Sequence, residues 1–178
     1  GRGAYWLGKS YQETGNVKKA EEYFKQGSKF LTTYYGQLCF KEINYGGEFI
    51  LKEDASYSKE YEKEFTKNKL VRIVKILKEL NHTKYSKDVL KHLANLNIES
   101  GSEVLAAKLA TEVERYDFAI QISKKASYEK RFYLKYNYPI ISTPREINNK
   151  PMPPSEMIHA IIRQESEFDS KANSYAGA

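Results

Sequence analysis

Residues 7–24 read LGKSYQETGNVKKAEEYF, and the spacing of small and aromatic residues in this stretch predicts two helices packed against each other. Gly8 and Ala20 are small enough to let two helices approach closely. Tyr11 and Phe24 fill the space beside them. Gly15 lies between the two segments, where the chain has to turn tightly. The stretch therefore predicts an antiparallel helix pair.

This spacing resembles one unit of a tetratricopeptide-type repeat, in which helix pairs stack into a solenoid. Only one unit is clear. Trp6 is displaced from the usual tryptophan position, Thr32 stands where proline is common, and no equally good copy follows at the repeat period of about 34 residues. We therefore expect a helical superhelix with degenerate units.

Helical periodicity continues along the chain. Residues 70–77 place Leu, Ile, Val and Leu at i, i+3, i+4 and i+7, the stripe of an amphipathic helix. Residues 89–96 carry a similar face, and residues 100–113 combine helix start signals with an apolar face. Residues 118–122 alternate like a strand, but their neighbours favour a helix. No segment reads as a β-hairpin, and Gly46–Gly47 predicts a turn between helices, so the expected fold class is all-α.

Proline divides the sequence, because all five prolines fall between residues 139 and 154. Proline interrupts helices, since it lacks an N–H group and clashes with the preceding turn. We therefore expect an α-superhelical body domain over residues 1–138, an extended Pro-rich connector over 139–154, and a second unit over 155–178.

Cysteine and histidine content excludes several kinds of site. Cys39 is the only cysteine, so an intrachain disulfide and a Cys-rich zinc site are excluded, and its apolar context predicts a buried, inert thiol. His82, His92 and His159 are isolated from one another in the sequence. We therefore expect no metal ion and no cofactor.

The sequence also lacks the hallmarks of membrane insertion. It has no apolar run near the roughly 20 residues that a transmembrane helix requires. It opens without a basic and then apolar leader, so we expect any export signal to lie outside this sequence.

Charge is unevenly distributed along the 178 residues. The net charge of the whole sequence is +6. Residues 155–178 hold four acidic and two basic side chains and have a net charge of −2, so residues 1–154 have a net charge of +8. A basic body favours polyanions such as nucleic acid, acidic lipid or an acidic glycan, although a solvated lysine-rich surface explains the same composition.

Residues 155–169, SEMIHAIIRQESEFD, carry the candidate chemistry. At about 100° per residue, Glu165 falls within the apolar stripe of the predicted helix, whereas Glu156 and Glu167 fall on the opposite side. The stripe consists of Ile158, Ile161 and Ile162. A carboxylate in apolar surroundings is a candidate general acid, because burial disfavours its charged form. A salt bridge at the helix end is the structural alternative.

The same segment resembles the opening of the catalytic domain of the soluble lytic murein transglycosylases. Residues 160–166 read AIIRQES and are followed by Phe168, Ser174, Gly177 and Ala178. In that family an A-I-I-R-Q-E-S helix precedes an S-x-x-G-A-x-G-L-M-Q stretch. The resemblance implies that residues 155–178 are the N-terminal part of a lysozyme-like domain that continues past Ala178, so this chain alone is expected to be inactive or incomplete.

The resemblance extends to the rest of the chain. The family has a basic, ring-forming superhelical body, whose last repeats carry patterns similar to residues 5–8, YWLG, and residues 34–38, YYGQL. Tyr138–Pro139 matches the connector that leads into the catalytic helix. One departure is Met152–Pro153–Pro154, which stands where many relatives have an aspartate cap followed by proline.

The resemblance implies a peptidoglycan lyase that uses one glutamate. Glu165 would protonate the glycosidic oxygen between N-acetylmuramic acid and N-acetylglucosamine, and would then act as base on the muramoyl 6-hydroxyl, forming a 1,6-anhydromuramoyl end. Ser166 and Ser174 would support the site, and Gly177 and Ala178 would begin the loop that lines the cleft. The implied setting is the bacterial periplasm, with glycan strands as substrate, cell-wall synthesis or divisome proteins as candidate partners, and no cofactor.

Three alternatives remain open at this point. A helical scaffold could bind protein partners without catalysis, and a hydrolase related to goose-type lysozyme would use a similar site. The third alternative is a basic nucleic-acid binder, because lysines and tyrosines interleave over residues 57–63 and 128–138. We nevertheless expect no nucleic-acid partner, because no recognition motif or defined stacking groove is evident.

Overall fold

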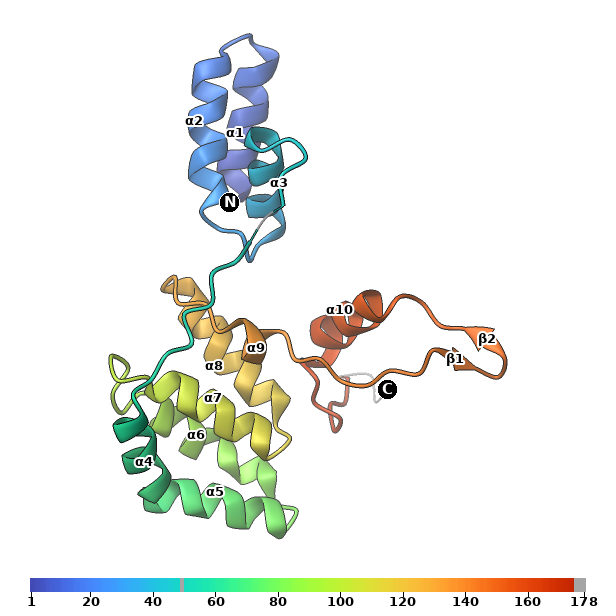
Figure 1. Ribbon diagram of the computed structural model, residues 1–178. Helices are drawn as coiled ribbons and strands as arrows, with labels where there is room; N and C mark the ends of the chain where they lie inside the picture. Colours follow the sequence, from blue (N-terminus) through green and yellow to red (C-terminus); the bar gives the residue numbers. More distant parts are fainter. Residues whose placement is uncertain (49, 175–178) are drawn as a thin grey trace. The chain divides into compact units, whose positions relative to one another are not determined.

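A computed structural model describes residues 1–48 and 50–174 of the chain (Figure 1). Helices hold 61% of the residues and strands 2%, so the predicted all-α class is confirmed. The chain divides into two compact units, residues 1–52 and 53–178. This division falls inside the segment expected to form one body domain, while the boundaries expected at 139 and 155 stay predictions. No helix in the described part of the chain is long and apolar enough to cross a membrane.

The first unit consists of three helices, α1 (Arg2–Glu13), α2 (Val17–Ser28) and α3 (Tyr34–Ile43). Its helices α1 and α2 form the predicted antiparallel pair. Gly15 has φ of +77° in the turn between them. A methyl group at Gly8 would lie 2.6 Å from Cδ1 and 2.8 Å from Cζ of Phe24, which confirms the close approach. Ala20 and Phe24 are both buried.

Helix α3 closes the small core of this unit. Cys39 is fully buried against α2, where a Cβ on Gly27 would collide with its sulfur. Burial raises the pKa of the Cys39 thiol. The predicted burial of Cys39 is therefore confirmed, and burial disfavours the thiolate, which is the reactive form.

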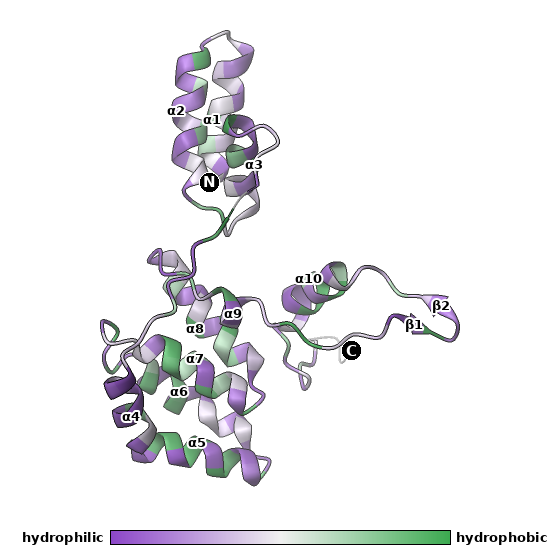
Figure 2. Ribbon diagram, in the orientation of Figure 1, coloured by the Kyte–Doolittle hydropathy of each residue, from purple (hydrophilic) through white to green (hydrophobic). Residues whose placement is uncertain are grey.

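Most of the helices of the second unit surround a hydrophobic core. They are α4 (Lys59–Lys67), α5 (Lys69–Glu79), the 3₁₀ turn η1 (Thr83–Tyr85), α6 (Ser86–Ala94), α7 (Ser102–Glu112), α8 (Tyr116–Tyr128) and α9 (Leu134–Asn137). Hydrophobic residues gather on α7, whereas α4 is mostly hydrophilic (Figure 2). The helices predicted from periodicity at 70–77, 89–96, 100–113 and 118–122 are all present as α5, α6, α7 and α8.

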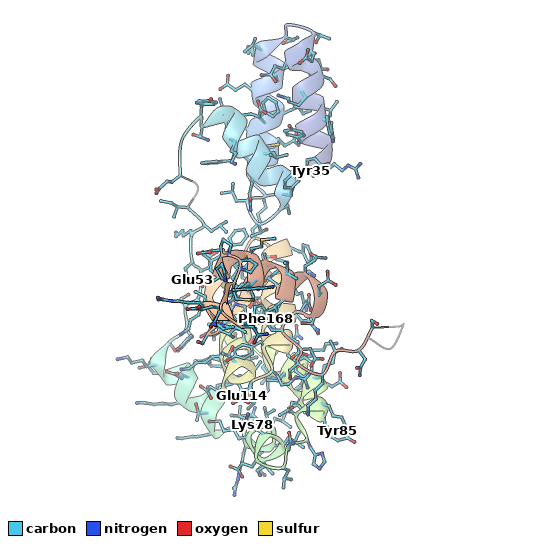
Figure 3. All side chains as sticks on the ribbon, turned by 90° about the vertical axis from the view of Figure 1, so that its right-hand side faces the viewer. Tyr35, Glu53, Lys78, Tyr85, Glu114 and Phe168 are labelled. Carbon is cyan, nitrogen blue, oxygen red and sulfur yellow. The ribbon has the colours of Figure 1, made fainter. Side chains whose placement is uncertain are left out.

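Ion pairs and hydrogen bonds between charged side chains link helices of the second unit, both at its surface and in its interior. Lys78 of α5 pairs with Glu114 in the turn that follows α7 (Figure 3). Inside, Glu103 is only 2% exposed and accepts hydrogen bonds from Nε of Arg131 at 3.0 Å and from the hydroxyl of Tyr133 at 3.0 Å. The buried carboxylate is stable there because it is paired with a cation and fully hydrogen-bonded.

Residues 139–154 contain no helix but are not wholly extended. β1 (Glu146–Ile147) and β2 (Lys150–Pro151) form a short antiparallel hairpin. Asn148 and Asn149 between them have φ of 52° and 60°, as in a type I′ turn, which asparagine tolerates. The prediction that no hairpin occurs is therefore wrong. Helix α10 (Ser155–Ser166) follows the hairpin.

Candidate active site

Helix α10 carries Glu165 and is defined at both ends by its local sequence. Pro154 occupies its N-cap position, where a missing N–H costs nothing. At the other end, Glu167 and Phe168 have φ of 50° and 65°, in the left-handed region that terminates helices. Such conformations cost a non-glycine residue about 1 kcal/mol each, so contacts made by these side chains have to hold them.

Those contacts link the end of α10 to α8. The carboxylate of Glu167 pairs with Nζ of Lys124 at 3.1 Å and accepts a hydrogen bond from Nε2 of Gln121 at 3.4 Å. The ring of Phe168, labelled in Figure 3, lies 6.4 Å from that of Tyr116. The prediction that Glu167 faces water is therefore wrong, because this residue lies beyond the helix, where its left-handed backbone turns the side chain toward α8.

Two polar side chains hold α10 against the end of α9 and the start of the connector. Arg163 donates from Nε to the carbonyl oxygen of Asn137 at 2.9 Å and from Nη2 to its side-chain oxygen at 2.7 Å. Its guanidinium also lies 4.8 Å from the ring centre of Tyr138. Nε2 of His159 accepts a hydrogen bond from the amide of Ile141 at 3.0 Å. His159 therefore helps to hold α10 in position against Ile141.

The covered face of α10 differs from the one that hydrophobic periodicity predicts. Ile158 and Ile162 are half-buried, but Ile161 is 52% exposed and Glu165 is also exposed. The expected apolar surroundings of Glu165 are therefore absent among the described residues. Arg163 rotates its side of the helix inward because its bidentate contact satisfies the buried main chain of Asn137.

Glu165 instead ends an exposed stripe along α10. Met157 and Ile161 precede it at intervals of four residues, and both are more than half exposed. Residues four apart on a helix lie on one face. The carboxylate of Glu165 thus borders an uncovered apolar strip and is open to a large ligand.

Two of the other predicted site residues, Ser166 and Ser174, lie among the residues that the structure describes. Ser166 lies about 100° further around the helix and donates from its hydroxyl to the carbonyl of Ile162 at 3.2 Å. Ser174 is exposed in the segment that follows α10. Gly177 and Ala178 lie outside the described residues.

A hollow of about 460 Å³ lies beside α10, on the side away from Glu165. Its lining includes Tyr138, Glu156, His159 and Arg163. On the helix, His159 and Arg163 are about 120° and 160° away from Glu165. Glu165 is not among the residues that line this hollow, which lies on another face of α10.

Sequence reasoning missed the residues that position α10, namely His159, Arg163 and Glu167. The sequence offered one indication of the role of Arg163, namely its place in the AIIRQES stretch two residues before Glu165. Among residues 1–48 and 50–174, no group of three or more histidine, cysteine or acidic side chains could hold a metal ion. Comparison of the sequence with protein-family models and with curated proteins finds no match.

Proposed function

We propose that the protein is a peptidoglycan lytic transglycosylase that cleaves the bond between N-acetylmuramic acid and N-acetylglucosamine without consuming water. The observation that carries the proposal is the ordered motif at the C-terminal end of the chain. AIIRQES, residues 160–166, forms the C-terminal part of α10, and Glu165 stands one residue before the end of this helix with its carboxylate accessible. A glycan strand can therefore reach it.

In the proposed reaction, Glu165 acts first as acid and then as base. Its carboxyl proton goes to the glycosidic oxygen as the bond to the anomeric carbon of the muramic acid breaks. The resulting carboxylate then takes the proton of the muramoyl 6-hydroxyl, whose oxygen bonds to that carbon. The products are a 1,6-anhydromuramoyl end and a free N-acetylglucosamine 4-hydroxyl, and Glu165 regains its proton.

The acid step sets a requirement on the surroundings of Glu165. A general acid has to hold its proton until the bond breaks, and desolvation of a carboxyl group favours its protonated form, so the proposed mechanism requires Glu165 to be desolvated when the substrate is bound. In the proposal, the bound glycan and the rest of the lysozyme-like domain cover the stripe formed by Met157, Ile161 and Glu165. Arg163 and His159 fix the helix so that this stripe faces outward.

The rest of the chain is consistent with this role. The close helix pair of α1 and α2 supports a superhelical body of repeat units. Residues 1–154 carry a net charge of +8, which favours an anionic glycan over a neutral one. The proposal places the protein in the bacterial periplasm.

Product masses test the proposal directly. The intact protein is incubated with purified peptidoglycan, and the released muropeptides are analysed by mass spectrometry. The expected products are one water lighter than those with reducing ends. Reducing ends would instead indicate a lysozyme-type hydrolase.

A non-catalytic helical scaffold is the second candidate, and the exposure of Glu165 favours it. It predicts that peptidoglycan stays intact in the same incubation. It also predicts that Glu165→Gln leaves the biological activity of the intact protein unchanged.

A further inference from the structure

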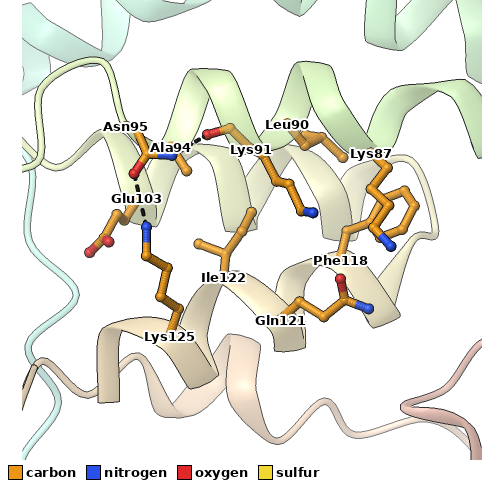
Figure 4. A pocket seen from close by; sticks show the side chains of 10 residues that line it. All are labelled: Lys87, Leu90, Lys91, Ala94, Asn95, Glu103, Phe118, Gln121, Ile122 and Lys125. Atoms are coloured by element: carbon orange, nitrogen blue, oxygen red, sulfur yellow. Dashed lines mark hydrogen bonds between the residues drawn. The ribbon is translucent and has the colours of Figure 1, made fainter. Parts of the chain in front are cut away.

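A separate hollow of about 200 Å³ opens between α6 and α8 (Figure 4). Its floor is apolar and consists of Leu90, Ala94, Phe118 and Ile122, each no more than 7% exposed. A cavity of about 150 Å³ is enough for a benzene-sized molecule. The hollow therefore has room for one aliphatic or aromatic side chain.

Three lysines surround this apolar floor. Lys87 and Lys91 come from α6, and Lys125 comes from α8 on the opposite side (Figure 4). None of the three forms an ion pair within residues 1–48 and 50–174. Nζ of Lys125 donates to the side-chain oxygen of Asn95 at 3.1 Å, a neutral partner. Three positive charges at the rim are thus uncompensated.

The acidic side chain in the lining of the hollow is that of Glu103. Its two oxygens are occupied by Arg131 and Tyr133. Arg131 also pairs with Glu129 at 2.8 Å, so Glu103, Glu129 and Arg131 together carry one net negative charge. The three lysines at the rim outweigh this charge, and the surroundings of the hollow remain net positive.

The floor is held in place before any ligand binds. The guanidinium of Arg115 lies 3.7 Å from the ring centre of Phe118, and Asp117 fixes that guanidinium through hydrogen bonds of 2.8 and 2.6 Å. A rigid pocket loses little entropy on binding, which favours affinity for a side chain of matching size.

We propose that this hollow is a docking site for an acidic peptide segment that inserts one apolar side chain between α6 and α8. The lysines at the rim pair with the carboxylates on either side of that anchor residue. A nucleic acid fits the geometry less well, because base stacking needs an exposed aromatic face and Phe118 is 5% exposed beneath Arg115. The occupant is thus a protein partner with an acidic surface segment.

The test uses a fluorescein-labelled acidic octapeptide with one central leucine, titrated with the 178-residue chain and followed by fluorescence anisotropy. A second peptide carries alanine in place of the leucine. The pocket variant combines Lys87→Gln, Lys91→Gln and Lys125→Gln. The control variant combines Lys59→Gln, Lys63→Gln and Lys69→Gln, three exposed lysines of α4 and α5, so both variants lose the same net charge.

The pocket variant is expected to weaken binding of the leucine peptide about tenfold, because three exposed charge pairs are lost together. The control variant should change binding less than about threefold at the same salt concentration. Replacing leucine by alanine in the peptide should also weaken binding about tenfold, since the apolar contact with the floor is lost. Circular dichroism confirms that both variants keep their helix content.

Several results would overturn the docking site. Equal weakening by both triple variants would show general charge attraction, and equal binding of the leucine and alanine peptides would show that the hollow is not entered. A Kd weaker than about 1 mM for the leucine peptide would also reject the site. Displacement of the peptide by a random oligonucleotide that the pocket variant fails to bind would assign the lysines to nucleic acid instead.

Discussion

Replacing Gly8 by alanine tests the helix pair on which the predicted body fold rests. The added methyl group would lie 2.6 Å and 2.8 Å from Cδ1 and Cζ of Phe24, with Cε1 closer still. Non-bonded carbon atoms prefer about 3.5–4.0 Å, so the helices or the ring have to move by about 1 Å. Phe24 is 3% exposed and has little room to move.

The magnitude follows from two opposing effects. Overpacking a core by one methyl group costs about 1–3 kcal/mol. Alanine is favoured over glycine within a helix by about 1 kcal/mol, which offsets part of this cost. We therefore expect Gly8→Ala to lower the free energy of unfolding of residues 1–52 by about 1 kcal/mol.

Gly3→Ala is the matched control. Gly3 lies in the same helix, and a Cβ there meets no atom within 4 Å. This substitution should therefore stabilise the unit by up to about 1 kcal/mol. The two variants should differ by the cost of the clash alone, about 1–3 kcal/mol.

The assay follows urea unfolding through the fluorescence of Trp6, the only tryptophan in the chain, which lies in α1. Because Trp6 belongs to the first unit, its signal reports on the helix pair. The reasoning is refuted if Gly8→Ala stabilises the protein as much as Gly3→Ala does, since the helices would then not meet at Gly8.

Two further predictions concern the buried network around Glu103. Arg131→Met leaves the Glu103 carboxylate, which is 2% exposed, with the Tyr133 hydroxyl as donor, and should lower the free energy of unfolding by about 2–3 kcal/mol. The control Arg72→Met replaces an exposed arginine and should lower it by less than about 0.5 kcal/mol. Equal losses of unfolding free energy for the two variants in urea titrations would contradict this prediction. Burial, followed by the Glu103 carboxylate, raises the pKa of Tyr133 from 10.0 to about 12, so the unfolded chain loses this proton first. The protonated Tyr133 hydroxyl therefore contributes on the order of 2 kcal/mol to the free energy of unfolding below pH 10, and this contribution is lost between pH 10 and 12. In urea titrations over that pH range, Tyr133→Phe should lose less unfolding free energy than the native chain.

Local sequence patterns were sufficient where one helix face is apolar and packed. Val74, Leu90 and Leu93 follow the predicted periodicity and are fully buried. The Gly8–Phe24 contact was also predictable, since a glycine on a helix face next to an aromatic ring is typical of close packing. These helices are held in place by the burial of apolar side chains on one face, which the periodicity of the sequence predicts.

The face of α10 was not predictable from hydrophobicity. A helix wheel counts Arg163 and His159 as polar and places them outward, yet Arg163 binds the main chain of Asn137 at the end of α9 and His159 binds the main chain of Ile141 in the connector. The hairpin at 146–151 was missed because two-residue strands show no alternation. Its signal was the Asn148–Asn149 pair, whose positive φ angles suit a type I′ turn.

The boundary between the two compact units was missed for a different reason. Proline content marked residues 139–154 as a connector, which stays a prediction, and side chains beyond it bond to α8 and α9. The observed division lies at residues 52 and 53, in a stretch without proline. Composition indicates irregular backbone, whereas unit boundaries depend on which contacts cross the segment.

The turnover of purified peptidoglycan by Glu165→Gln in the intact protein tests the central claim most directly. Glutamine keeps the size of the side chain but can neither donate the proton nor accept it back, so release of anhydro products should fall about 10²- to 10⁴-fold. Glu146→Gln, an exposed change in the connector hairpin, should leave the rate unchanged. A folded Glu165→Gln protein that releases anhydro products at the native rate would contradict the assignment of Glu165 as the catalytic residue.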